Sequence, residues 1–146
     1  MKKQLYLMLL LLGVTLLSIM GCKKHHISPV TIIGTNTASP KPGELTGTFT
    51  ATGAFNTSGT ADMIVVPVGT DSIHCTYTMT APDGTFILAL DCEKPPMMSG
   101  HWQVTGGTGR YEDLRGTGPL TMAFPPDVPA GVLSTETLTG LAWFNH

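Results

Sequence analysis

The side chains best suited to chemistry in this chain are its three cysteines, and two of them lie in its most regular segment. Residues 72–80 (SIHCTYTMT) and 85–92 (TFILALDC) alternate polar and apolar side chains and are joined by a turn sequence, 81–84 (APDG). This pattern predicts a β-hairpin with Cys75 and Cys92 on its apolar face.

The register of this hairpin decides whether the two thiols can form a disulfide. If Cys75 lies directly opposite Cys92, a bridge can form. A four-residue turn containing Pro82 instead favours pairing of Cys75 with Leu90, which leaves Cys92 a diagonal neighbour about 7–8 Å away, too far for an unstrained bridge. An oxidising compartment favours the bridge, so a disulfide and two buried thiols are both open. A catalytic cysteine is not expected, because the neighbouring His74 points to the opposite face.

The third cysteine, Cys22, follows a hydrophobic N-terminal segment. Two lysines precede residues 5–20 (LYLMLLLLGVTLLSIM), a stretch shorter than the roughly 20 residues that span a bilayer. The sequence at 19–22 (IMGC) resembles the bacterial lipobox, which implies a signal peptide over 1–21 and a lipidated N-terminal Cys22. Lys23 in place of Asp implies the outer membrane, facing the periplasm rather than the cell surface.

Composition divides the rest of the chain into a tether and a body. Residues 22–43 contain three prolines and no acid, which predicts a flexible tether with a net charge of +3. Residues 44–146 carry three basic residues against all ten acidic residues, a net charge of −7. Membrane contact is therefore expected through the lipidated N-terminus, and no nucleic acid is expected as a partner.

Neither a metal nor a cofactor is expected. His25 and His26 could form half of a metal site, but protein zinc sites use three or four ligands. The sequence does not indicate an oligomeric state.

The body is predicted to be all-β. It is rich in Thr and Gly, and no segment shows a helical period. Besides the hairpin, the pattern indicates strands over 45–52, 61–68, 100–105, 116–124 and 132–139, and a continuation of the last strand to Phe144 is open. Seven or eight short strands with frequent turns favour a sandwich or a closed barrel.

A glycine-rich run at 100–118 (GHWQVTGGTGRYEDLRGTG) is the most distinctive motif. It lacks the Gly-Lys-Ser/Thr ending of a phosphate-binding loop, so a strand, a bend and a second strand explain it better. Residues 104–111 (VTGGTGRY), followed by 114–116 (LRG), are similar to the signature of dirigent proteins and allene oxide cyclases. Looser similarity extends to 47–49 (GTF), 83–86 (DGTF) and Gly140.

This resemblance implies an antiparallel, eight-stranded closed barrel with a central cavity. The residues that carry the barrel signature are Gly106, Gly107, Thr108, Gly109, Tyr111, Leu114 and Gly116. Members of these families steer reactive intermediates with polar and acidic groups inside the barrel, and no acid of this sequence is matched to those positions.

The positions expected for the remaining acidic residues favour a binding protein over an enzyme. Glu112 and Asp113 are expected in a solvated bend. Asp62 and Asp91 are taken as the strand acids, and alternation places Asp91 outside. We therefore expect a lipid-anchored envelope protein whose barrel binds a small apolar ligand or an envelope partner. A purely structural lipoprotein is the next alternative, and a cyclase or isomerase ranks below it, because an enzyme needs an inward-facing carboxylate, Tyr or His with a shifted pKa.

Overall fold

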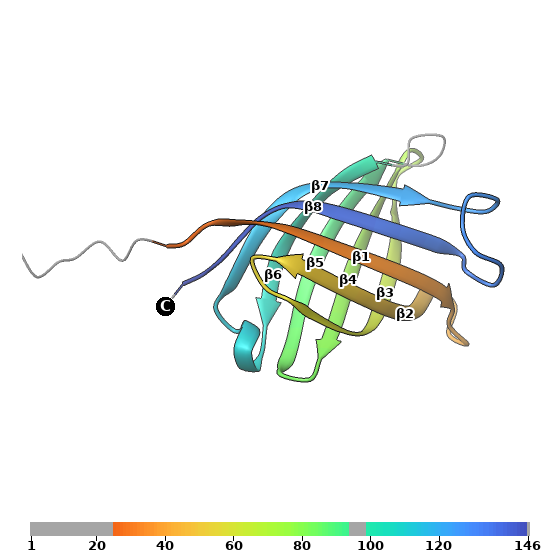
Figure 1. Ribbon diagram of the computed structural model, residues 1–146. Coiled ribbons are helices and arrows are strands. Elements are labelled where there is room, and N and C mark those ends of the chain that lie inside the picture. The colour runs from red at the N-terminus through yellow and green to blue at the C-terminus, as the bar shows by residue number, and fades with distance from the viewer. Residues whose placement is uncertain (1–24, 94–98, 146) are drawn as a thin grey trace, which may run out of the picture.

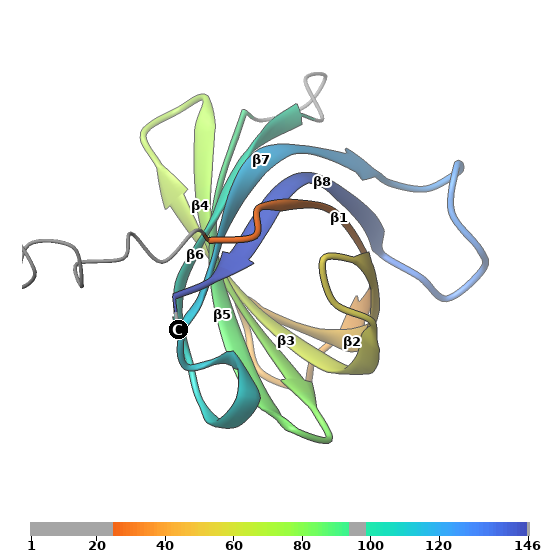
Figure 2. The same ribbon diagram turned by 60° about the vertical axis from the view of Figure 1, so that its left-hand side comes forward.

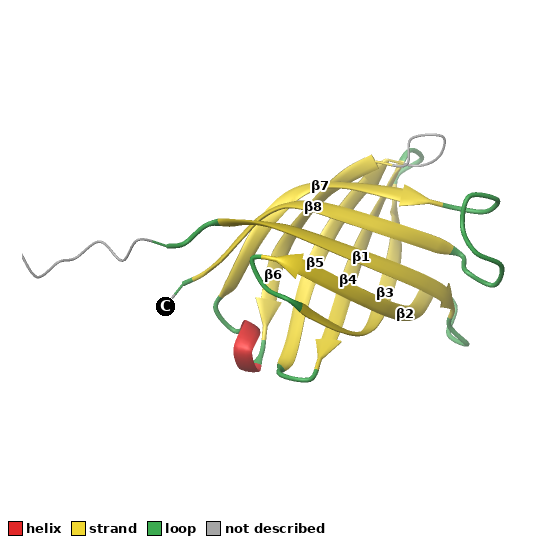
Figure 3. Cartoon of the chain, in the orientation of Figure 1, coloured by secondary structure: helices red, strands yellow, loops and turns green. Residues whose placement is uncertain are grey.

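Eight antiparallel strands form a closed barrel in which each strand pairs with its chain neighbours, and β8 closes the barrel against β1 (Figure 1). The structure is a computed structural model that describes residues 25–93 and 99–145. The strands are β1 (Ser28–Ala38), β2 (Glu44–Gly53), β3 (Thr57–Val68), β4 (Ser72–Ala81), β5 (Gly84–Glu93), β6 (Ser99–Gly107), β7 (Leu114–Ala123) and β8 (Ser134–Phe144). A 3₁₀ turn, η1 (Gly109–Tyr111), connects β6 to β7 (Figure 3). The predicted all-β closed barrel is confirmed.

The hairpin of β4 and β5 has the register that its proline-containing turn favours. Cys75 pairs with Leu90. The next pair on the same face, towards the start of β4 and the end of β5, is Ile73 with Cys92. The two cysteines are therefore diagonal neighbours on the inner face, and both thiols are free.

The first strand corrects the predicted domain boundary. Residues 28–38 lie within the segment expected to be a flexible tether, yet they form β1, which pairs with both β2 and β8. Its alternate residues Val30, Ile32 and Asn36 are buried inside the barrel. The barrel thus begins at Ser28 and not at residue 44, because a strand needs an apolar residue only at every second position and can be otherwise polar.

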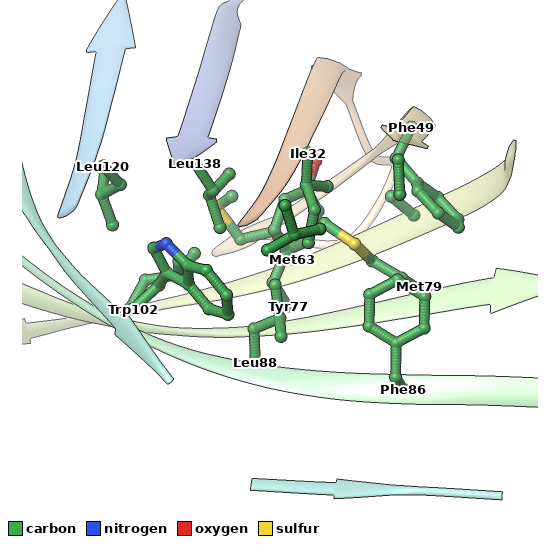
Figure 4. Close-up of a cluster of buried hydrophobic side chains, with 14 of the residues drawn as sticks. Ile32, Phe49, Met63, Tyr77, Met79, Phe86, Leu88, Trp102, Leu120 and Leu138 are labelled. Atoms are coloured by element: carbon green, nitrogen blue, oxygen red, sulfur yellow. The ribbon is translucent and has the colours of Figure 1, made fainter. Parts of the chain in front are cut away.

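Large side chains fill the middle of the barrel. Trp102, Met63, Met79, Leu88 and others point inward from successive strands and have almost no exposed surface (Figure 4). Trp102 donates its indole N–H to the carbonyl oxygen of Thr139 at 2.9 Å, which satisfies the polar atom of this large core residue. An eight-stranded barrel has an interior just wide enough for such filling.

Aromatic side chains close one end of the barrel. We call this the aromatic end. It is where β1 begins and β8 finishes (Figure 2). Phe55 packs edge-to-face against Phe86, Tyr111 and Phe144, with ring centroids 5.6–6.3 Å apart. Phe49 contacts Phe86 in the same way at 5.4 Å. Such pairs add about 0.5–1.5 kcal/mol each beyond the buried area, so this end is expected to be rigid.

The predicted signal peptide and the predicted lipidation site, Cys22, lie outside the described residues. Within the part of the chain that the structure describes, no helix has the length and apolar character needed to cross a membrane.

Candidate functional site

The glycine-rich signature lies at the aromatic end and packs the connection between β6 and β7 against the turn between β4 and β5. A Cβ on Gly107 would lie 2.1 Å from the carbonyl oxygen of Tyr111, and a Cβ on Gly109, whose φ is 58°, would lie 2.4 Å from that of Asp83. The close approach lets the Thr108 N–H bind the Thr85 carbonyl at 2.8 Å. The signature therefore has a packing role in this chain.

The other signature residues serve the same end of the barrel. Tyr111 and Leu114 are buried in the core, as expected for residues that close it. Gly116 fits under Trp102, whose ring would lie 3.2 Å from an added Cβ, while Gly106 has open space around it. Glu112 and Asp113 are exposed in the bend.

A second group of residues brings a carboxylate into the barrel interior. Glu136 of β8 lies beside Asn36 of β1 and Ser134, opposite Tyr77 of β4, and all four side chains are buried. The Asn36 amide donates to Glu136 Oε2 at 2.5 Å, and the Ser134 hydroxyl donates to Oε1 at 2.6 Å. The Tyr77 hydroxyl donates to Asn36 Oδ1 at 3.0 Å and lies 3.4 Å from Glu136 Oε2. We call these four residues the Glu136 cluster.

Burial dominates the electrostatics of the cluster. It raises the pKa of Glu136 above its usual range, and the hydrogen bonds from Ser134, Asn36 and Tyr77 only partly oppose this shift. Burial and the nearby Glu136 carboxyl also raise the pKa of Tyr77, whose hydroxyl therefore stays protonated. Burial thus shifts the Glu136 carboxyl towards its neutral form, against the hydrogen bonds that its oxygens accept.

Gly34 provides the space that the cluster needs. A Cβ at this position would lie 2.2 Å from the Tyr77 hydroxyl oxygen and 2.9 Å from Glu136 Oε2. Two bulky polar groups can meet at the wall of β1 because this position has no side chain.

The sequence-based list of strand acids was wrong because it omitted Glu136. This residue falls inside the predicted strand 132–139, and alternation from the apolar Leu138 places it on the inner face. The sequence therefore already contained the pattern that places Glu136 inside the barrel. Asp91, in contrast, is exposed on the outer face as predicted, where it binds His74 Nδ1 at 2.7 Å.

The two interior thiols lie next to each other. A hydrogen bond between Cys75 and Cys92, together with burial, raises the pKa of the Cys75 thiol. The same hydrogen bond lowers the pKa of Cys92, although burial opposes this effect. One hydrogen bond therefore joins the two thiols, which occupy diagonal positions on β4 and β5.

A pocket of about 660 Å³ opens at the end of the barrel opposite the aromatic end, and we call this the pocket end. Its inner wall is a row of residues on successive strands, in which Ile73 pairs with Cys92, Cys92 with Gly100, and Gly100 with Leu120. Gly100 has no room for a side chain, because a Cβ would lie 2.1 Å from the Asp91 carbonyl oxygen. We call these four residues the inner row.

The outer edge of the pocket is polar. Asp91, Glu93 and His101 line it together with neighbouring Ser and Thr residues. His101 Nε2 lies 2.9 Å from the Thr117 hydroxyl on the outer surface. The Glu136 cluster does not contribute to this lining, so the buried acid and the pocket are separate features of the barrel.

The described histidines do not assemble a metal site. His25 Nδ1 lies 3.3 Å from the Phe144 carbonyl oxygen, and His26 Nδ1 lies 2.8 Å from the Ser28 hydroxyl, so both residues contact the aromatic end. Over residues 25–93 and 99–145, His, Cys, Asp and Glu form no group of three that could hold a metal ion.

Comparison with solved structures finds a likeness to a dirigent protein. A solved structure of a dirigent protein, the pterocarpan synthase PsPTS1, is similar to 85% of this chain and 97% of its own, with a TM-score of 0.43 and 12% sequence identity. At this identity neither site residues nor chemistry are transferred to this chain. No family model matches the sequence, and no curated protein matches it significantly.

Proposed function

We propose that this chain is a lipid-anchored protein of the bacterial outer membrane whose barrel binds a small apolar molecule at the pocket end, without catalysis. The observation that carries the binding role is the pocket of about 660 Å³, which lies within the range of about 300–1,000 Å³ usual for small-molecule sites. Its inner row is largely apolar, and apolar lining with a few polar groups at the edge is typical of such sites.

The pocket can be tested with a neutral apolar fluorophore such as N-phenyl-1-naphthylamine. We expect saturable binding that Ile73→Trp abolishes, because the indole would occupy the inner row. Val104→Trp is the matched control, since Val104 is also partly buried but does not line the pocket. Equal binding by both variants, with both folded by circular dichroism, would place the ligand elsewhere. The absence of any binding would favour a purely structural lipoprotein.

The anchor is supported by the sequence around Cys22 and is tested by mass spectrometry of the mature N-terminus. We expect a lipidated Cys22 in the membrane fraction and a soluble Cys22→Ser variant. An unmodified Met1 in the mature protein would contradict the anchor.

The start of β1 sets how such an anchor would hold the barrel. Cys22 precedes Ser28 by six residues, which reach about 20 Å when fully extended. Even this maximum is shorter than the mean reach of about 25 Å that a flexible tether over residues 23–43 would have. Because Ser28 lies at the aromatic end, the pocket would face away from the anchored leaflet.

A cyclase or isomerase is the second candidate, and the Glu136 cluster favours it. The cluster supplies the inward-facing carboxyl and tyrosine that such an enzyme needs, with raised pKa values. It ranks second because Glu136 is 0% exposed and does not line the pocket.

The ¹³C shift of the Glu136 carboxyl, followed by NMR, separates the two roles. A bound molecule that contacts the acid would move this resonance. A shift unchanged at saturating ligand would contradict catalysis by Glu136.

A further inference from the structure

Cys92 carries a nucleophilic thiol at the inner wall of the pocket. It belongs to the inner row and to the pocket lining, and it is 4% exposed. Cys75 is 0% exposed and does not line the pocket. A molecule seated against the inner row can therefore reach the sulfur of Cys92 but not that of Cys75.

The strand register keeps the two thiols from joining in an ordinary disulfide. Cys75 pairs with Leu90 and Cys92 pairs with Ile73, so the two cysteines are diagonal neighbours. Diagonal residues of an antiparallel pair lie about 7–8 Å apart, beyond the separation of about 4.4–6.8 Å between Cα atoms that a disulfide spans. A small group attached to the Cys92 sulfur would therefore not be displaced readily by the Cys75 thiol.

Cys75 instead supports the reactive form of Cys92. A cysteine reacts as its thiolate, and the hydrogen bond with Cys75 lowers the pKa of Cys92. Burial and the charges of Asp91 and Glu136 oppose this effect. The same hydrogen bond and burial raise the pKa of Cys75, which stays protonated. Cys75 is therefore a hydrogen-bond donor to Cys92 and not a second nucleophile.

We propose that Cys92 is a modification site, at which a small disulfide with apolar substituents bound in the pocket forms a mixed disulfide. This inference rests on the proposed binding function of the pocket. The Cys92 thiolate attacks one sulfur of the bound molecule, the S–S bond of that molecule breaks, and a new S–S bond joins the attacked sulfur to Cys92. The other half leaves as a thiolate and takes up a proton, which balances the proton that Cys92 released. Cys92 is oxidised and the leaving half is reduced, so no further oxidant is needed.

A small neutral aromatic disulfide, 4,4′-dithiodipyridine, tests this inference on the full chain. The variant Cys22→Ser is used, because it leaves Cys75 and Cys92 as the only thiols of the sequence. We expect the folded protein to release one equivalent of thiopyridone and to carry one mixed disulfide, located at Cys92 by peptide mass spectrometry. Adding Cys92→Ser should abolish the release, whereas unfolding the protein in guanidinium should make both thiols react.

The route through the pocket is tested with the fluorophore N-phenyl-1-naphthylamine and with blocking variants. We expect the fluorophore to slow the release in proportion to its occupancy of the pocket. Ile73→Trp should abolish the release as it abolishes fluorophore binding, and Val104→Trp, outside the lining, should retain it. The anionic dithiobis(nitrobenzoate) should react about tenfold more slowly, each rate being divided by that of the unfolded protein, because segment 44–146 has a net charge of −7.

The role of Cys75 is tested by the pH dependence of the reaction in two variants. Cys75→Ser keeps a hydroxyl donor and Cys75→Ala removes the donor, so the pH midpoint of the rate should be higher in Cys75→Ala. The other titratable residues around the thiol are common to both variants: Asp91, Glu93, His101 and Glu136. Their effects therefore cancel in the comparison, and equal midpoints would overturn the role of Cys75 as a donor.

The outcomes separate the modification from the pocket. No release from the folded chain, with fluorophore binding intact, would overturn the modification and leave the pocket in place. Failure of both would overturn the pocket itself. Loss of both thiols without an adduct would mean that Cys75 displaces the small group, which would overturn the mixed disulfide. A rate unaffected by bound fluorophore would assign the reaction to opening of the barrel and overturn the pocket as its route.

Discussion

A buried glutamate is the residue that departs most from an ordinary barrel core. Burying a carboxyl is unfavourable unless its hydrogen-bonding groups are satisfied. Glu136 meets this condition through Asn36, Ser134 and Tyr77, and among the described residues no buried side-chain nitrogen or oxygen lacks a partner. The cluster therefore places polar side chains in the core without leaving any of their nitrogen or oxygen atoms without a hydrogen-bond partner.

The raised pKa of Glu136 makes stability depend on pH in a definite direction. A carboxyl whose folded pKa lies above its unfolded value, here 4.5, stabilises the fold most below that unfolded value, and the contribution is lost as the pH rises through the folded pKa. Glu136→Gln keeps a neutral group of the same shape. We expect the free energy of unfolding of the wild type to fall relative to Glu136→Gln as the pH rises above about 4.5, by at most about 1.4 kcal/mol per pH unit.

Chemical denaturation of both proteins across the same pH series measures this difference, and other titrating groups cancel in the comparison. Parallel curves for the two proteins would show that the Glu136 carboxyl titrates normally.

Gly34 gives a second test at the scale of one residue. We expect Gly34→Ala to lower the free energy of unfolding by about 1–3 kcal/mol, because the new methyl group would overlap the Tyr77 hydroxyl. Gly106→Ala, in the wall of β6, is the control and should change stability by less than about 0.5 kcal/mol, since the nearest atom to its Cβ is 4.0 Å away.

A double-mutant cycle identifies the clashing atom. In a Tyr77→Phe background the hydroxyl is gone, so Gly34→Ala should cost less than in the wild type. An equal cost in both backgrounds would mean that the glycine is required for another reason.

At the scale of elements, the alternation of polar and apolar side chains predicted the strands whose two faces differ most in polarity. The β4–β5 hairpin was predicted from its alternation, and of the two registers that the sequence left open the structure has the one that the turn at Pro82 favours. The predicted strand at 132–139, whose continuation to Phe144 the sequence left open, spans Ser134–Phe144 in the structure. β1 was missed because its proline, threonines and glycine resemble a linker in composition, although Val30 and Ile32 already mark its inner face.

The candidate site was harder to predict because closure of the barrel assembles it. Asn36 and Glu136 are separated by 100 residues and Tyr77 and Glu136 by 59. Alternation can place each of them on an inner face, but only the pairing of β1 with β8 and the stagger of the strands bring them together. The pocket likewise combines the ends of five strands, β3 to β7.

The position of β1 makes a direct prediction about where the folded domain begins. We expect a fragment of residues 44–146 to be unfolded or aggregated, because removing β1 leaves β2 and β8 as unpaired edges and exposes the core. A fragment of residues 25–146 should fold, as judged by near-ultraviolet circular dichroism and dispersed NMR amide signals. A cooperative unfolding transition in the shorter fragment would show that β1 is dispensable.

At the scale of the whole molecule, the barrel has two unlike ends. The aromatic end holds the glycine-rich signature, the start of β1 and a closely packed set of rings. The pocket end holds an apolar inner row beside exposed carboxylates. This division separates the end that is built for stability from the end that is open to a ligand.

The central claim is that a small apolar molecule binds at the pocket end, and a titration followed by backbone amide NMR tests it most directly. With N-phenyl-1-naphthylamine added to the mature chain, we expect saturable shifts that are largest at Ile73, Cys92, Gly100 and Leu120 and negligible at Phe55 and Tyr111. Shifts confined to the aromatic end, or none up to the solubility of the probe, would contradict the claim.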